Sequence, residues 1–113
     1  MLEATFEPVS NREDWIETCE VRDQSNALVD LTGAVIVIAV RDKQTKSQLM
    51  QALTADSSIT INAPGIFQFT FPLSKMRTMT ASKAYEIGCT IQLNGTTQQF
   101  FVGTVNVIDG IVQ

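Results

Sequence analysis

The chain has 113 residues, of which 44% are hydrophobic and 18% charged, and its formal net charge is −4. That length suits one domain with a single core, and no stretch approaches the roughly 20 apolar residues needed to span a membrane. The six basic residues between positions 41 and 83 are not interleaved with aromatic residues, so we expect no nucleic-acid partner and no membrane partner.

Residues 1–14 show no clear periodicity and include Pro8, which predicts an extended N-terminal arm ahead of a domain at 15–113. The arm has no basic cluster, so we do not expect a signal peptide. From residue 15 to 22 the sequence alternates as a strand does, with Cys19 facing inward.

The densest signal lies at 30–41, where a polar turn leads into seven consecutive apolar residues. Asp30 and Thr32 can bond nearby backbone N–H groups, and Gly33 permits a positive φ, so we expect a tight turn there. The β-branched residues that follow it predict a strand.

This strand is apolar on both of its faces. We expect one set of side chains to face the core (Ile36, Ile38 and Val40) and the alternate set to point outward (Val35, Val37 and Ala39). An outward apolar stripe is a candidate interface with another chain, and a cover made by a loop or the N-terminal arm is the alternative. If the strand lies outermost in its sheet, its edge can also pair with a second chain.

The remaining sequence predicts short strands separated by turns. A strand at 49–54 has a helix as its alternative, and Phe67, Phe69 and Phe71 share one face of a later strand. One or two helical turns are expected at 73–79. Strands follow at 85–93 and 98–107, joined by an Asn94-Gly95 hairpin turn, and Gly103 allows a bulge or a close approach. The pattern predicts an all-β sandwich of about seven strands with one short helical turn.

The chain has no histidine, which removes the usual general base and nearly all zinc sites. Four carboxylates near the N-terminus are the remaining catalytic candidates (Glu13, Asp14, Glu17 and Glu20), but Glu17 and Glu20 fall on opposite faces of a strand. We therefore expect no enzymatic activity, no catalytic residue, no metal and no cofactor.

Cys19 and Cys89 lie 70 residues apart, a separation that suits the cross-sheet disulfide of an immunoglobulin domain. In such a domain, however, the packing tryptophan follows the first cysteine, whereas Trp15 precedes Cys19. With no export signal, two reduced thiols are favoured over a disulfide.

Oxygen-bearing side chains gather between residues 23 and 30 (Asp23, Ser25, Asn26 and Asp30). Turn formation is one explanation. Together with Trp15 as an exposed aromatic side chain, they also suggest an alternative function, a soluble calcium- or carbohydrate-binding β-sandwich module.

Between Trp15 and Val107 the chain contains six short motifs in a particular order. They are Val21-Arg22-Asp23, Asp30-Leu31-Thr32-Gly33-Ala34, Val40-Arg41, Gly65-Ile66-Phe67-Gln68-Phe69-Thr70-Phe71-Pro72, Tyr85-Glu86-Ile87 and Gly103-Thr104-Val105-Asn106-Val107. Their order resembles that of small virion proteins of tailed bacteriophages and prophages. It is similar to the N-terminal immunoglobulin-like domain of siphophage upper baseplate proteins.

This resemblance implies an immunoglobulin-like antiparallel sandwich that serves as a non-enzymatic virion component. Its implied partners are other virion proteins and copies of itself, and its implied location is the virion, after synthesis in the host cytoplasm. The chain departs from the family in lacking a glycine-rich turn after Asp23 and in having Lys83-Ala84 where a glycine usually precedes the tyrosine. We expect no fibre region after Val107, which leaves capsid decoration or a head–tail connector, tail accessory or baseplate role.

Overall fold

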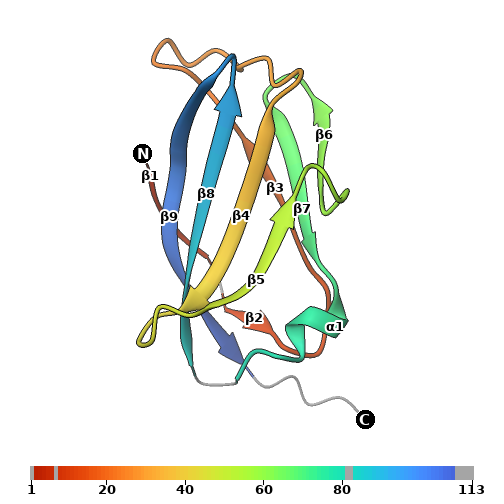
Figure 1. Ribbon diagram of the computed structural model, residues 1–113, viewed down its shortest axis with the longest axis vertical. Helices are drawn as coiled ribbons and strands as arrows, with labels where there is room; N and C mark the ends of the chain where they lie inside the picture. The colour runs from red at the N-terminus through yellow and green to blue at the C-terminus, as the bar shows by residue number, and fades with distance from the viewer. Residues whose placement is uncertain (1, 7, 81–82, 109–113) are drawn as a thin grey trace.

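Two β-sheets packed face to face form the fold shown in Figure 1. The computed structural model describes residues 2–6, 8–80 and 83–108; Met1 and Glu7 of the predicted arm, residues 81–82 and residues 109–113 of the predicted domain lie outside them. The fold is an immunoglobulin-like β-sandwich with one short helix, and its strands pair antiparallel except where β1 and β2 pair with β9. No helix among the described residues is long and apolar enough to cross a membrane.

The larger sheet has the strand order β1-β9-β8-β4-β5, and β2 also pairs with β9. The smaller sheet has the order β3-β7-β6. The bounds are β1 (Leu2–Thr5), β2 (Val9–Ser10), β3 (Trp15–Glu20), β4 (Val35–Asp42), β5 (Gln48–Leu53), β6 (Ile59–Ala63), β7 (Ile66–Phe71), α1 (Leu73–Met76), β8 (Ala84–Leu93) and β9 (Thr96–Ile108).

Seven strands, β3 to β9, follow the N-terminal arm, as the sequence pattern predicts. The segment at 49–54 is a strand rather than a helix. Asn94 and Gly95 both have positive φ, 53° and 79°, which confirms the two-residue hairpin turn between β8 and β9.

No bulge forms at Gly103, which pairs regularly with Ile87. The register instead shifts between Cys89 and Thr90, which pair with Phe101 and Gln99 and leave Phe100 unpaired. A bulge sets two consecutive residues against one on the partner strand. The rings of Phe100 and Phe101 both contact core aromatic residues as a result.

Aromatic side chains fill the space between the sheets. Phe67, Phe69 and Phe71 of β7 are fully buried, which confirms their predicted common face. The indole ring of Trp15 lies edge-on to Phe69 with 5.3 Å between ring centroids. Such aromatic contacts add to the stability provided by burial itself.

The N-terminal arm is extended and becomes part of the larger sheet. β1 and β2 both run parallel to β9, with Leu2 opposite Phe101 and Val9 opposite Val107. Between them, Phe6 places its ring 5.7 Å from those of Trp15 and Phe101. The arm therefore supplies hydrogen-bond partners to the β9 edge and one aromatic side chain to the core.

The segment after α1 is tied to β8 by Tyr85. Its buried phenolic oxygen accepts a hydrogen bond from the backbone N–H of Thr80 at 2.8 Å. This arrangement is similar to the tyrosine corner of immunoglobulin-like sandwiches, where a tyrosine near the start of the corresponding strand bonds back to the preceding segment.

Candidate interaction surface

The turn at the start of β4 forms as the sequence predicts. The Oδ1 atom of Asp30 accepts hydrogen bonds from the backbone N–H and the hydroxyl of Thr32, at 3.0 and 2.7 Å. Gly33 has a φ of +77°, a conformation that favours glycine. The turn leads the chain into β4 and so helps to define which side chains of β4 face the core and which face outward.

The predicted faces of β4 are also confirmed. Ile36, Ile38 and Val40 are completely buried between the sheets. On the outer face, Val35 is 47% exposed and Val37 and Ala39 are half-buried. β4 thus presents apolar side chains to both sides, and the outer set is open to solvent.

Two of the possibilities that the sequence leaves open for β4 are not found in the structure. β4 is not outermost, because β8 and β5 flank it and pair with it on both sides. The described residues of the N-terminal arm do not cover the outer stripe, because β1 and β2 lie beside β9 and extend the sheet. Any partner of β4 must therefore bind through side chains rather than by backbone pairing.

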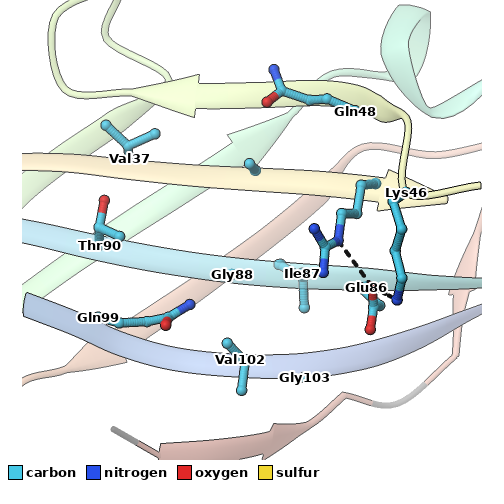
Figure 2. A pocket seen from close by; sticks show the side chains of 12 residues that line it. Val37, Lys46, Gln48, Glu86, Ile87, Gly88, Thr90, Gln99, Val102 and Gly103 are labelled. Carbon is cyan, nitrogen blue, oxygen red and sulfur yellow. Dashed lines mark hydrogen bonds and ion pairs between the residues drawn. The ribbon is translucent and has the colours of Figure 1, made fainter. Parts of the chain in front are cut away.

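The outer face of the larger sheet contains a hollow of 390 Å³, shown in Figure 2 and called here the outer groove. Ala39 and Gly88 lie side by side in register, with Val102 next to Gly88. Ala39 has only a methyl group and Gly88 has no side chain, so the floor of the groove lies below the side chains around it. The groove is lined by Val37, Ala39, Arg41, Lys46, Gln48, Glu86, Ile87, Gly88, Thr90, Gln99, Val102 and Gly103.

One end of the outer groove carries an ion-pair network, marked by dashed lines in Figure 2. Arg41 Nε and Lys46 Nζ both donate to Glu86 Oε1, at 2.9 and 2.8 Å. The hydrogen bonds from Lys46 and Arg41 hold the pKa of Glu86 below its ordinary value. Both cationic side chains remain about half exposed, so each can still reach a group on a partner.

Of the predicted interface residues, Val37 and Ala39 line the outer groove, whereas Val35 lies on the same face beyond it. Three further groove residues, Gly88, Glu86 and Val102, were not predicted from the sequence. A glycine at an outward position of the alternating strand at 85–93 is the signal that marked Gly88, since it leaves a gap in an otherwise continuous face.

A second hollow, of 640 Å³, lies between the β3–β4 connection and the β8–β9 hairpin. Apolar side chains form much of its wall (Val21, Val29, Leu31, Ile91, Leu93 and Phe100), and the charged residues on its rim are Arg22 and Asp23. The Asp23 carboxylate accepts hydrogen bonds within its own turn. The other polar residues that line the cavity are Gln24, Thr96, Gln98 and Gln99.

Three of the four candidate carboxylates, Glu13, Asp14 and Glu17, line a shallow hollow of 220 Å³. Asp14 accepts the backbone N–H of Leu73 at 2.7 Å, and Glu17 accepts the indole N–H of Trp15 at 3.1 Å. The fourth, Glu20, pairs with Arg22 at 2.9 Å. These bonds give Asp14, Glu17 and Glu20 structural partners.

The side chains that suggested a calcium- or carbohydrate-binding function already have partners within the chain. Asp23 accepts bonds from Ser25 and from the backbone N–H of Ala27, and these bonds lower its pKa. Among the described residues, no three Cys, Asp or Glu side chains are placed to hold a metal ion. Trp15, which could have been exposed to a ligand, is instead buried, because the residue is 4% exposed and its ring packs on Phe69.

Cys19 and Cys89 project from facing sheets and are both free thiols. Burial raises the pKa of Cys19 to about 11 and that of Cys89 to about 12. At pH 8, only a very small fraction of Cys89 is then present as the thiolate, the form that reacts.

We expect Cys89 in the native protein to react with a thiol reagent at least about a hundred-fold more slowly than in denaturant. The measurement follows release of the chromophore from a disulfide reagent at pH 8, with Cys19→Ser and Cys89→Ser assigning each reaction. Rapid modification of Cys89 in the native state would contradict its burial. If the protein has no titratable thiol after denaturation without a reductant, the two cysteines form a disulfide.

No family model and no curated protein matches this chain. Among solved structures it is similar to CopC from Methylosinus trichosporium OB3b, with 12% sequence identity and a TM-score of 0.48, over 93% of this chain and 89% of that chain. At this level of similarity, the β-sandwich assignment rests on the strands and register of the chain itself.

Proposed function

We propose that this chain is a non-enzymatic structural component of a tailed bacteriophage virion. In this role it docks on other virion proteins as a head–tail connector, baseplate or tail accessory protein, or as a capsid decoration protein. The order of motifs along residues 15–107 supports the assignment to a tailed-phage virion. The exposed apolar side chains of β4 support a role in docking.

The observation that carries the proposal is the outer apolar stripe of β4. Val35 is 47% exposed, and Val37 and Ala39 are partly exposed beside the outer groove. Covering a valine stabilises a complex by roughly 1.5 kcal/mol, at about 25 cal/mol per Å² of apolar surface. A partner that covers this stripe therefore gains binding energy without any change in the fold.

The absence of histidine and the local bonds of the N-terminal carboxylates favour a binding role over a catalytic one. The free edge of β3 in the smaller sheet offers a further contact site, since among the described strands β3 pairs with β7 alone. At the β5 edge, Lys75 Nζ already donates to the backbone oxygen of Gln51 at 3.3 Å.

Val37→Asp is expected to reduce incorporation into particles at least about ten-fold while the isolated chain stays folded. An outward position tolerates a charge in the free protein, but a covered contact does not. The chain is quantified by mass spectrometry in purified particles of a phage whose own copy carries the substitution, and folding is checked by circular dichroism.

Thr60→Asp provides the matched control, because it adds the same charge at an exposed position on the smaller sheet. Normal incorporation of Val37→Asp would show that the stripe faces solvent in the particle. Absence of the wild-type chain from all purified particles would remove the proposed virion role itself.

A further inference from the structure

The outer groove has a positive charge in a chain that is negative overall. The charged side chains that line it are Arg41, Lys46 and Glu86, so two positive charges and one negative charge leave a net charge of +1, whereas the whole chain carries −4. Arg41 donates through Nε, and its two terminal nitrogens bond no atom in the described part of the chain. The groove is therefore complementary to an apolar side chain that has a carboxylate nearby.

Such a surface exists on the opposite side of the same molecule. The exposed side chains of β3 and the residue before it are Asp14, Ile16, Thr18 and Glu20, here called the β3 face. Ile16 is 53% exposed, the largest value among the large hydrophobic residues that the structure describes. Asp14 is held in place by its bond from the Leu73 N–H, and Glu13 beside it is also exposed.

The spacing of the two surfaces matches. Outward positions on an extended strand repeat every two residues, or about 6.7 Å. On β4, Ala39 lies two residues before Arg41; on the β3 face, Asp14 lies two residues before Ile16. With the strands running in opposite directions, Ile16 lies over Ala39 and Gly88 when Asp14 meets Arg41. Thr18 then lies opposite Val37.

We propose that the outer groove binds the β3 face of a second copy of this chain. The inference rests on the proposed role of the outer groove as an interface, and it names the occupant. The two surfaces lie on the outer faces of different sheets, so each copy offers one of each (Figure 1). Such a contact is heterologous, and it produces a ring if the rotation closes or a linear stack if it does not.

The first test measures association of the wild-type chain by sedimentation velocity from about 1 µM to about 1 mM. We expect the mean mass to rise with concentration, and to rise less at about 0.5 M salt than at about 0.05 M, because an ion pair at the rim is screened. A wild-type chain that stays monomeric throughout overturns the proposal. The virion experiment with Val37→Asp can still succeed in that case, so failure here is distinct from failure of the proposed function.

The second test uses Ala39→Glu, which places a carboxylate in the groove, and Ile16→Lys, which places a cation on the β3 face. Each variant alone is expected to associate at least about ten-fold more weakly than wild type. An equimolar mixture is expected to recover association, because the intact groove of Ile16→Lys meets the intact β3 face of Ala39→Glu. This complementation is specific to a heterologous contact.

Thr60→Lys serves as the control, since it adds the same charge to the smaller sheet two strands away from β3 and should associate as wild type does. Circular dichroism melting of every variant establishes that the monomers are folded. Unchanged association of Ile16→Lys with loss in Ala39→Glu would show a two-fold contact through the groove alone and overturn the proposal. A mixture that remains monomeric would also overturn it.

Discussion

Replacement of Ile38 by aspartate is expected to prevent the chain from folding. Ile38 is completely buried on the inner face of β4, where Cys89 and Ala52 flank it in register. Placing an unpaired carboxylate there costs several kcal/mol. That cost is comparable with the total stability of a small domain, about 5–15 kcal/mol. Circular dichroism and one-dimensional NMR of the purified variant measure the outcome.

Two neighbouring substitutions sharpen this experiment. Ile38→Val should cost only about 0.5–1.5 kcal/mol, because it keeps an apolar side chain in the core. Val37→Asp introduces the same charge one residue away on the outer face and should leave the fold intact. A folded Ile38→Asp variant together with an unfolded Val37→Asp variant would mean that the two faces of β4 are reversed.

Phe69→Ala is expected to lower the free energy of unfolding by about 3–5 kcal/mol. Phe69 is fully buried at the centre of β7, and its ring lies 5.3 Å from that of Trp15 and 5.7 Å from that of Phe71. Truncation removes these contacts and leaves a cavity that the two sheets cannot close. Urea denaturation monitored by circular dichroism gives the change in midpoint and slope.

Ile16→Ala is the comparison for this measurement, because Ile16 is 53% exposed and its truncation in the monomer should change stability by less than about 0.5 kcal/mol. The denaturation is performed at low protein concentration so that association does not contribute. A loss below about 1 kcal/mol for Phe69→Ala would show that the aromatic cluster does not form the principal core.

The features that the sequence predicts correctly depend on neighbours within a few residues. The turn of Asp30, Thr32 and Gly33 forms because a carboxylate bonds the residue two positions later and glycine accepts a positive φ. The faces of β4 and the common burial of Phe67, Phe69 and Phe71 follow from the two-residue period of a strand. The Asn94-Gly95 turn likewise defines its own hairpin.

The tertiary structure alone decided which strands lie next to one another. The apolar run of β4 reads equally as an edge or a central strand, and only its pairing with β8 and β5 shows the latter. In the same way, Trp15 becomes a core residue because Phe6 and Phe69 pack around it.

The outer groove also depends on long-range pairing, since Ala39, Gly88 and Val102 meet only through the register of β4, β8 and β9. Local side-chain chemistry therefore determined the turns, the strands and their inner faces from the sequence by itself. The groove, its charge and the position of the N-terminal arm depend on contacts between residues far apart in the chain. Packing of the whole core sets the register of the strands that make these contacts.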